Sequence, residues 1–118
     1  MNKILVVDDD TDILGLVEIM LHSNNYDVKA ISRWQEINSS ITDFHPDLVL
    51  LDVSLGGADG REICKSIKEA KETKNLPVIL FSANPDMGLY LNQCRAQSFV
   101  SKPFEIKHLL NTIQQFLN

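Results

Sequence analysis

The sequence predicts an α/β protein built on a single doubly wound sheet of five parallel strands, with helices on both faces. Three uninterrupted apolar runs, at 4–7, 48–51 and 77–81, have the composition of strands that are buried on both faces. Segments whose apolar residues recur at helical spacing alternate with these runs and with two weaker strand-like segments. This alternation predicts parallel strands joined by right-handed crossover helices.

The chain begins with a buried strand, a helix and an edge strand. Residues 4–7 form the first strand, and apolar residues at helical spacing between 13 and 21 indicate the helix that follows. Asp10 lies where a capping side chain is expected for that helix. Residues 26–31 alternate with charged residues, which is typical of a strand that is less buried than its neighbours.

The middle of the chain contains the central strand and the helices on either side of it. Residues 34–44 carry one apolar stripe and predict a helix, for which Ser32 is the expected cap. The central strand, 48–52, ends in an aspartate. The glycine-containing segment 53–60 predicts a flexible loop, and a polar helix is expected after it as far as Lys74.

The last part of the chain predicts a strand at 77–81, a helix over 87–94, a short strand at 98–101 and an amphipathic helix over 106–117. The first, third and fourth strands are the most apolar, so we expect them at the centre of the sheet. The strand order 2-1-3-4-5 satisfies this ranking and places the topological switch point between the first and third strands. This is the flavodoxin-like (βα)5 arrangement.

Length and composition describe one domain, 1–118, of an ordinary globular kind. The net charge is −5 and no basic cluster is longer than a pair, which argues against direct nucleic-acid binding by this domain. No segment has the length of a membrane helix or the pattern of a signal peptide. Cys64 and Cys94 are far apart in helical segments and are expected to be packing residues. We therefore expect a cytoplasmic protein.

Reactive side chains follow four of the five predicted strands. Asp8 and Asp9 follow the first strand, Asp52 ends the third, Ser82 follows the fourth and Lys102 follows the fifth. Parallel strands place their carboxyl ends at one edge of the sheet, where open α/β folds bind ligands. We therefore expect these five side chains to meet in one pocket.

Such a pocket is suited to phosphoryl transfer. Three neighbouring carboxylates repel one another, and Mg²⁺ relieves that repulsion with a few carboxylates, a carbonyl and retained waters. Lys102 and the metal would neutralise charge, Ser82 would donate to a phosphoryl oxygen, and Asp52 would attack the phosphorus. Each residue also has a simpler interpretation, because aspartates cap helices, a serine can begin a helix and a lysine can lie on the surface.

Four short motifs in the order found here resemble those of the receiver domain of two-component response regulators. They are Val6-Val7-Asp8-Asp9, Leu50-Leu51-Asp52, Ser82-Ala83 and Lys102-Pro103-Phe104. The resemblance spans essentially the whole chain. It implies a phosphoacceptor that takes a phosphoryl group from a phosphohistidine of a sensor histidine kinase or a histidine phosphotransfer protein. It does not imply a conventional turnover enzyme.

The resemblance also implies a role for each matched position. Asp52 is the expected phosphoacceptor, and Asp8, Asp9, Asp52 and the backbone carbonyl of Ser54 are the expected Mg²⁺ ligands, with Asp9 binding directly. Lys102 is expected to contact the phosphoryl group and to precede a cis peptide bond at Pro103. Ser82 and Phe99 match the switch positions, and Ser54 and Asn84 match positions that tune dephosphorylation. The family signals through the face made by its fourth helix, fifth strand and fifth helix, and a homodimer through these helices is left open.

Three positions depart from the family pattern. Gly56 stands where many relatives have proline, so the loop after Asp52 is expected to be looser. Arg95 stands where a glycine usually ends the fourth helix, and the stretch before Lys102 is slightly short. Phe99 lacks the hydroxyl group of a tyrosine. These departures concern the output surface rather than the acidic residues.

Other classes of protein fit the sequence less well. A haloacid-dehalogenase-type enzyme requires a threonine or valine where Asp12 stands in the run from Asp8. A calcium-binding EF-hand loop requires glycine where Ile13 stands. The alternative left open is a receiver-like interaction module that signals without phosphorylation.

Overall fold

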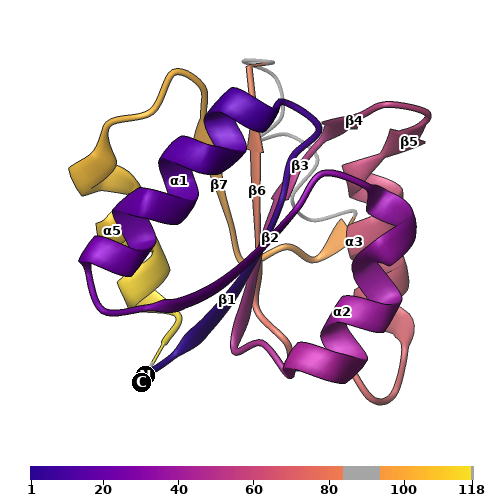
Figure 1. The fold of residues 1–118 in the computed structure, drawn as a ribbon. Coiled ribbons are helices and arrows are strands. Elements are labelled where there is room, and N and C mark those ends of the chain that lie inside the picture. The colour runs from indigo at the N-terminus through magenta and orange to yellow at the C-terminus, as the bar shows by residue number, and fades with distance from the viewer. Residues whose placement is uncertain (84–93, 118) are drawn as a thin grey trace.

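The uninterrupted apolar runs form the centre of a five-stranded parallel sheet in the computed structural model, which describes residues 1–83 and 94–117 (Figure 1). The strands are β1 (Lys3–Val7), β2 (Asp27–Ile31), β3 (Leu48–Asp52), β6 (Val78–Ser82) and β7 (Ser98–Ser101). Their order is β2-β1-β3-β6-β7, so the predicted order 2-1-3-4-5 is confirmed. Every residue of β3 and β6 is buried, whereas β2 and β7 include partly exposed residues, as expected for edge strands.

Helices cover both faces of this sheet. On one face lie α1 (Thr11–Ser23) and α5 (Ile106–Gln115), and on the other lie α2 (Ile37–Phe44) and α3 (Gly60–Glu69) (Figure 1). Successive strand residues point to opposite faces, so Val6 joins the core under α1 and α5 while Leu5 joins the core under α2 and α3. Within the described part of the chain, no helix is both long and apolar enough to cross a membrane.

The two predicted helix caps have different outcomes. Asp10 caps α1 as expected, because its carboxylate accepts hydrogen bonds from the backbone N–H groups of Asp12 (3.0 Å) and Ile13 (3.3 Å). The cap expected at Ser32 is wrong. A 3₁₀ turn, η1 (Trp34–Glu36), precedes α2. The N-cap residue is Arg33 for η1 and Glu36 for α2, and neither side chain makes a capping hydrogen bond.

Helix α3 is shorter than the sequence predicts, because it ends at Glu69 rather than near Lys74. Two side-chain hydrogen bonds connect the end of this helix with the turns that follow it. The Thr73 hydroxyl donates to the Ile67 carbonyl (2.6 Å), and the Lys68 ammonium donates to the Leu76 carbonyl (2.6 Å). These bonds stabilise a set of turns over 71–75 and compete with continuation of the helix.

The segment after Asp52, which the sequence predicts as a flexible loop, is a small antiparallel hairpin. Its strands are β4 (Ser54–Leu55) and β5 (Ala58–Asp59). Gly57 occupies the turn with φ +85°, a left-handed conformation that glycine adopts without a steric penalty. The hairpin orders the chain immediately beside the carboxyl end of β3.

Cys64 and Cys94 are buried, lie close together and form no disulfide, which agrees with their interpretation as packing residues. The Cys64 thiol donates to the Cys94 carbonyl at 3.3 Å. Burial, with the neighbouring Cys94, raises the pKa of the Cys64 thiol to about 12. A thiol with so high a pKa stays protonated at neutral pH and is a poor nucleophile.

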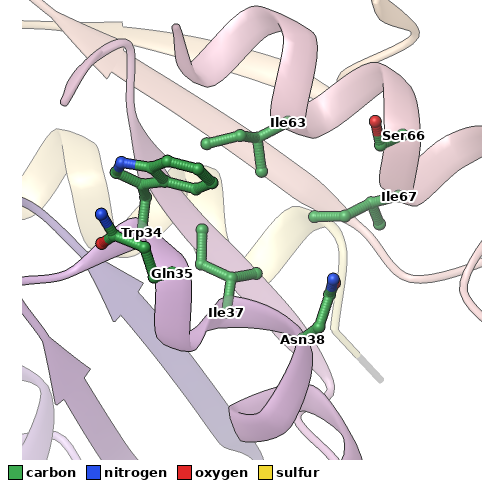
Figure 2. Close-up of a pocket in the computed structure, with 7 residues that line it drawn as sticks. All are labelled: Trp34, Gln35, Ile37, Asn38, Ile63, Ser66 and Ile67. Atoms are coloured by element: carbon green, nitrogen blue, oxygen red, sulfur yellow. The ribbon is translucent and has the colours of Figure 1, made fainter. Parts of the chain in front are cut away.

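An apolar hollow of about 180 Å³ separates the start of α2 from α3. Figure 2 shows the Trp34 ring and Ile37 on one side of it and Ile63 and Ile67 on the other. The remaining described side chains that line it are the neutral Gln35, Asn38 and Ser66. This hollow has no titratable lining group among the described residues and is not the reactive site.

Candidate functional site

The reactive side chains meet at the carboxyl edge of the sheet. Asp8 follows β1, Asp52 ends β3, Ser82 ends β6 and Lys102 follows β7. These residues line one open pocket of about 400 Å³, the acidic pocket, whose described members are Asp8, Asp9, Asp10, Asp52, Ser54, Ser82, Ala83 and Lys102. The five side chains that the sequence assigned to one pocket therefore lie together.

A lysine bridges two of the buried carboxylates in this pocket. The Lys102 Nζ atom lies 3.0 Å from Asp8 Oδ2 and 3.4 Å from Asp52 Oδ1. The same ammonium lies over the Phe81 ring, 4.6 Å from its centroid. Asp8 is fully buried and also accepts a hydrogen bond from the Asp10 backbone N–H (2.9 Å). These contacts hold the ammonium group between the ends of β1 and β3.

The electrostatic state of Asp52 is set mainly by burial. Its exposed fraction is 3%, and burial together with the charge of Asp8 raises its pKa to about 6, although the Lys102 ammonium acts in the opposite direction. Asp52 is therefore a carboxylate at neutral pH whose charge is poorly solvated. Such a group is stabilised by any further cation or by transfer of its charge to a ligand.

The carboxylates of Asp8, Asp9 and Asp52 can hold a metal ion. One oxygen from each lies within 4.8 Å of the other two. Asp9 is exposed and its Oδ2 accepts a hydrogen bond from the Gly56 backbone N–H (3.1 Å), which ties the hairpin to the pocket. Hard carboxylate oxygens with one side open to water fit Mg²⁺, which retains several of its waters when bound.

Other residues that the sequence singled out lie at different distances from the pocket. Ser54 lines it, and its N–H lies 3.4 Å from Asp52 Oδ1. The Lys102–Pro103 peptide bond is cis. Phe99 lies in β7, is partly buried and packs against the core under α2 and α3. Asn84 lies outside the described residues.

Gly60 supports the pocket from behind Asp52 and was not singled out by the sequence, because its role depends on a contact with the other end of the same loop. Its backbone N–H donates to the Val53 carbonyl at 2.7 Å. A Cβ atom at this position would collide with the backbone carbonyl oxygen of Asp52 and would lie 2.8 Å from the Val53 Cα. Gly60 therefore permits α3 to begin directly against the residue that ends β3.

We expect Gly60→Ala to destabilise the protein by about 3 kcal/mol, because the clash is with backbone that cannot rotate away. Gly15→Ala is the matched control. Gly15 lies within α1, and a methyl group added there would meet no atom within 4 Å, so this change should stabilise the protein by about 1 kcal/mol. Urea unfolding at equilibrium measures both. Equal effects of the two substitutions would contradict a specific close approach at Gly60.

Comparisons with known proteins converge on one family. A family model described as the response regulator receiver domain matches residues 4–114. The receiver domain of NtrX from Brucella abortus is 30% identical with a TM-score of 0.87, and the match covers 97% of each chain. The N-terminal signal receiver domain of a two-component response regulator from Bacteroides fragilis is 28% identical with a TM-score of 0.86, over 100% of this chain and 98% of that one. A chemotaxis response regulator of Vibrio cholerae is 25% identical with a TM-score of 0.89, over 99% of each chain.

Proposed function

The chain belongs to the response regulator receiver domain family, and we propose on this basis that Asp52 accepts a phosphoryl group from a phosphohistidine. Receiver domains are phosphoacceptor modules of signal transduction rather than conventional enzymes. The phosphodonor is a sensor histidine kinase or a histidine phosphotransfer protein. Phosphorylation then changes the surface that a downstream partner reads.

The observation that carries this proposal is the environment of the Asp52 carboxylate. It ends the central strand, lies 3.4 Å from the Lys102 ammonium and shares a pocket with Asp8 and Asp9. A carboxylate with a pKa raised to about 6 is an anion at neutral pH that is incompletely stabilised by its surroundings. Attack on phosphorus removes this poorly stabilised charge from Asp52, because the negative charge passes to phosphoryl oxygens that the pocket can contact.

The transfer itself is a single displacement. A carboxylate oxygen of Asp52 forms a bond to phosphorus while the bond from phosphorus to the donor imidazole nitrogen breaks, and the imidazole leaves with the electron pair. The Lys102 ammonium would move from its carboxylate partners toward a phosphoryl oxygen, and the Ser82 hydroxyl would donate to another. Asp8, Asp9, Asp52 and the Ser54 carbonyl would hold Mg²⁺, which would supply compensating positive charge for the phosphoryl oxygens.

The remaining roles follow from the family and stay proposals for this chain. Ser82 and Phe99 would act as the switch, and the changed surface would comprise β7, α5 and the segment that precedes β7. Ser54 and Asn84 would tune the rate of dephosphorylation. A homodimer through the same surface is compatible with these roles.

Mass spectrometry of the intact protein tests the proposal. Incubation with Mg²⁺ and acetyl phosphate should add the mass of one phosphoryl group, and EDTA should prevent the addition because the pocket then lacks compensating charge. A gain that persists in EDTA would contradict the metal assignment. No gain with acetyl phosphate or with a phosphorylated histidine partner would instead support an interaction module that signals without phosphorylation.

A further inference from the structure

A second charged hollow lies at the opposite edge of the sheet from the acidic pocket. It holds about 390 Å³ and is lined by Lys68, Lys74, Asn75, Arg95 and Gln97, which we call the basic hollow. Lys68 is in the last turn of α3, and the other four residues lie in the segments that lead into β6 and β7. Because the strands are parallel, this is the amino-terminal edge of the sheet.

The basic hollow gathers three cations without carboxylate partners among the described residues, where no ion pair involves Lys68, Lys74 or Arg95. The protein as a whole carries a net charge of −5, so this local excess of positive charge runs against its overall balance. Burial lowers the pKa of the Lys68 ammonium, and the charge of Arg95 lowers it further. Three like charges around one hollow are unfavourable unless an anion joins them.

Two of the donors in the basic hollow are held in place by the fold. Lys68 is only 5% exposed, and its Nζ donates to the Leu76 carbonyl, which leaves two further N–H donors on the ammonium. The Gln97 side-chain carbonyl accepts from the Val78 backbone N–H (2.7 Å), which fixes the amide and directs its nitrogen, a donor, away from that bond. A ligand would therefore meet donors that need little further ordering.

Arg95 is held in a conformation that its side chain disfavours. Its φ is 61°, in the left-handed region where glycine is the usual residue, and the family resemblance also expects glycine here. One positive charge at the end of a helix is explained by attraction to the helix carbonyl groups. That attraction does not explain why cations from three segments line the same hollow.

We propose that the basic hollow binds a small polyvalent anion of the phosphate class. Its described lining offers ammonium, guanidinium and amide donors, which suit phosphoryl oxygens, and the arginine can contact two oxygens at once. None of these five side chains is aromatic or aliphatic, so the described lining offers no stacking surface for a nucleotide base. Pyrophosphate therefore represents the ligand chemistry better than a nucleotide does.

Calorimetric titration of the protein with inorganic pyrophosphate tests this proposal. EDTA removes metal so that the acidic pocket repels the anion, and potassium chloride keeps the ionic strength constant. We expect saturable binding that weakens roughly tenfold in Lys74→Gln and in Arg95→Gly, because each loses a charged hydrogen-bond donor. Lys71→Gln, in the same turn region but outside the described lining, should bind as the unaltered protein does.

Each other result has a definite meaning. An equal loss of pyrophosphate affinity in Lys71→Gln would mean that the anion is attracted by surface charge in general. A loss of affinity in Lys102→Gln would place the anion in the acidic pocket. Either result, or the absence of saturable binding, overturns the proposal. ADP is the second ligand. If it binds no more tightly than pyrophosphate, the phosphoryl groups alone are recognised, and markedly tighter binding would contradict the assigned ligand class.

Discussion

Asp52→Asn is expected to abolish the phosphoryl gain completely under conditions that fully modify the unaltered protein. The amide is nearly isosteric with the carboxylate, so the shape of the pocket is retained while the anionic nucleophile is lost. The amide also cannot form the acyl phosphate linkage. Intact-protein mass spectrometry after incubation with Mg²⁺ and acetyl phosphate measures the outcome.

Asp43→Asn is the matched control for this loss. Asp43 is an exposed carboxylate near the end of α2, outside the described lining of the acidic pocket, and its replacement should leave the mass gain unchanged. Circular dichroism should show that both variants are folded. If Asp52→Asn still gains a phosphoryl group, Asp52 is not the acceptor.

The second large effect concerns stability without metal. The Asp52 carboxyl group has a pKa of about 6 when folded, against an ordinary value of 3.8. Between these values the folded protein keeps a proton that the unfolded chain has released, so stability falls as pH rises through this interval. The contribution of Asp52 protonation to the free energy of unfolding is fully present below about pH 4 and is lost above about pH 6. The pKa shift of Asp52 corresponds to roughly 3 kcal/mol.

Asp52→Asn removes this pH dependence because the amide does not titrate. In EDTA at pH 7 the variant should be more stable than the unaltered protein by up to about 3 kcal/mol. Urea unfolding at a series of pH values from about 4 to about 8 measures the difference between the two proteins. Comparing the two proteins also removes the contribution of Asp59, whose pKa is lowered by its hydrogen bond to Arg61 and whose effect has the opposite sign.

At neutral pH, addition of Mg²⁺ should reduce or reverse the difference in the free energy of unfolding between the two proteins. The metal requires the ionised carboxylate, so it stabilises the unaltered protein more than the asparagine variant. A clearly destabilising effect of Asp52→Asn without metal would contradict mutual repulsion of the carboxylates in the acidic pocket. So would identical pH profiles for the two proteins.

The acidic pocket could be predicted from sequence because each of its parts has a local signature. Val6 and Leu50 belong to apolar runs that end in aspartates, and Ser82 follows a third such run. Once these runs are recognised as parallel strands, topology alone brings their carboxyl ends to one edge. Asp10 was predictable as a cap for the same reason, since a cap and the helix it begins are neighbours in sequence.

The features that the sequence did not predict depend on particular hydrogen bonds and close approaches, which periodicity and composition do not reveal. Helix α3 ends at Glu69, where the Thr73 hydroxyl bonds to the Ile67 carbonyl and the Lys68 ammonium bonds to the Leu76 carbonyl. The hairpin of β4 and β5 stands where composition indicated only a flexible loop. In the sequence, Gly60 is one of several glycines in that loop. The structure shows that, among the described glycines, it alone approaches the Asp52 carbonyl too closely for a Cβ atom.

Hydrophobic runs and the residues that end them are local properties of the chain. The central strands and the side chains at their ends therefore follow from the sequence. The environment of the Asp52 carboxylate depends instead on packing, since its burial and its 3.4 Å contact with Lys102 involve residues from opposite halves of the chain. The same holds for the basic hollow. Lys68 and Arg95 belong to different segments of the sequence, and packing brings them together at one edge of the sheet.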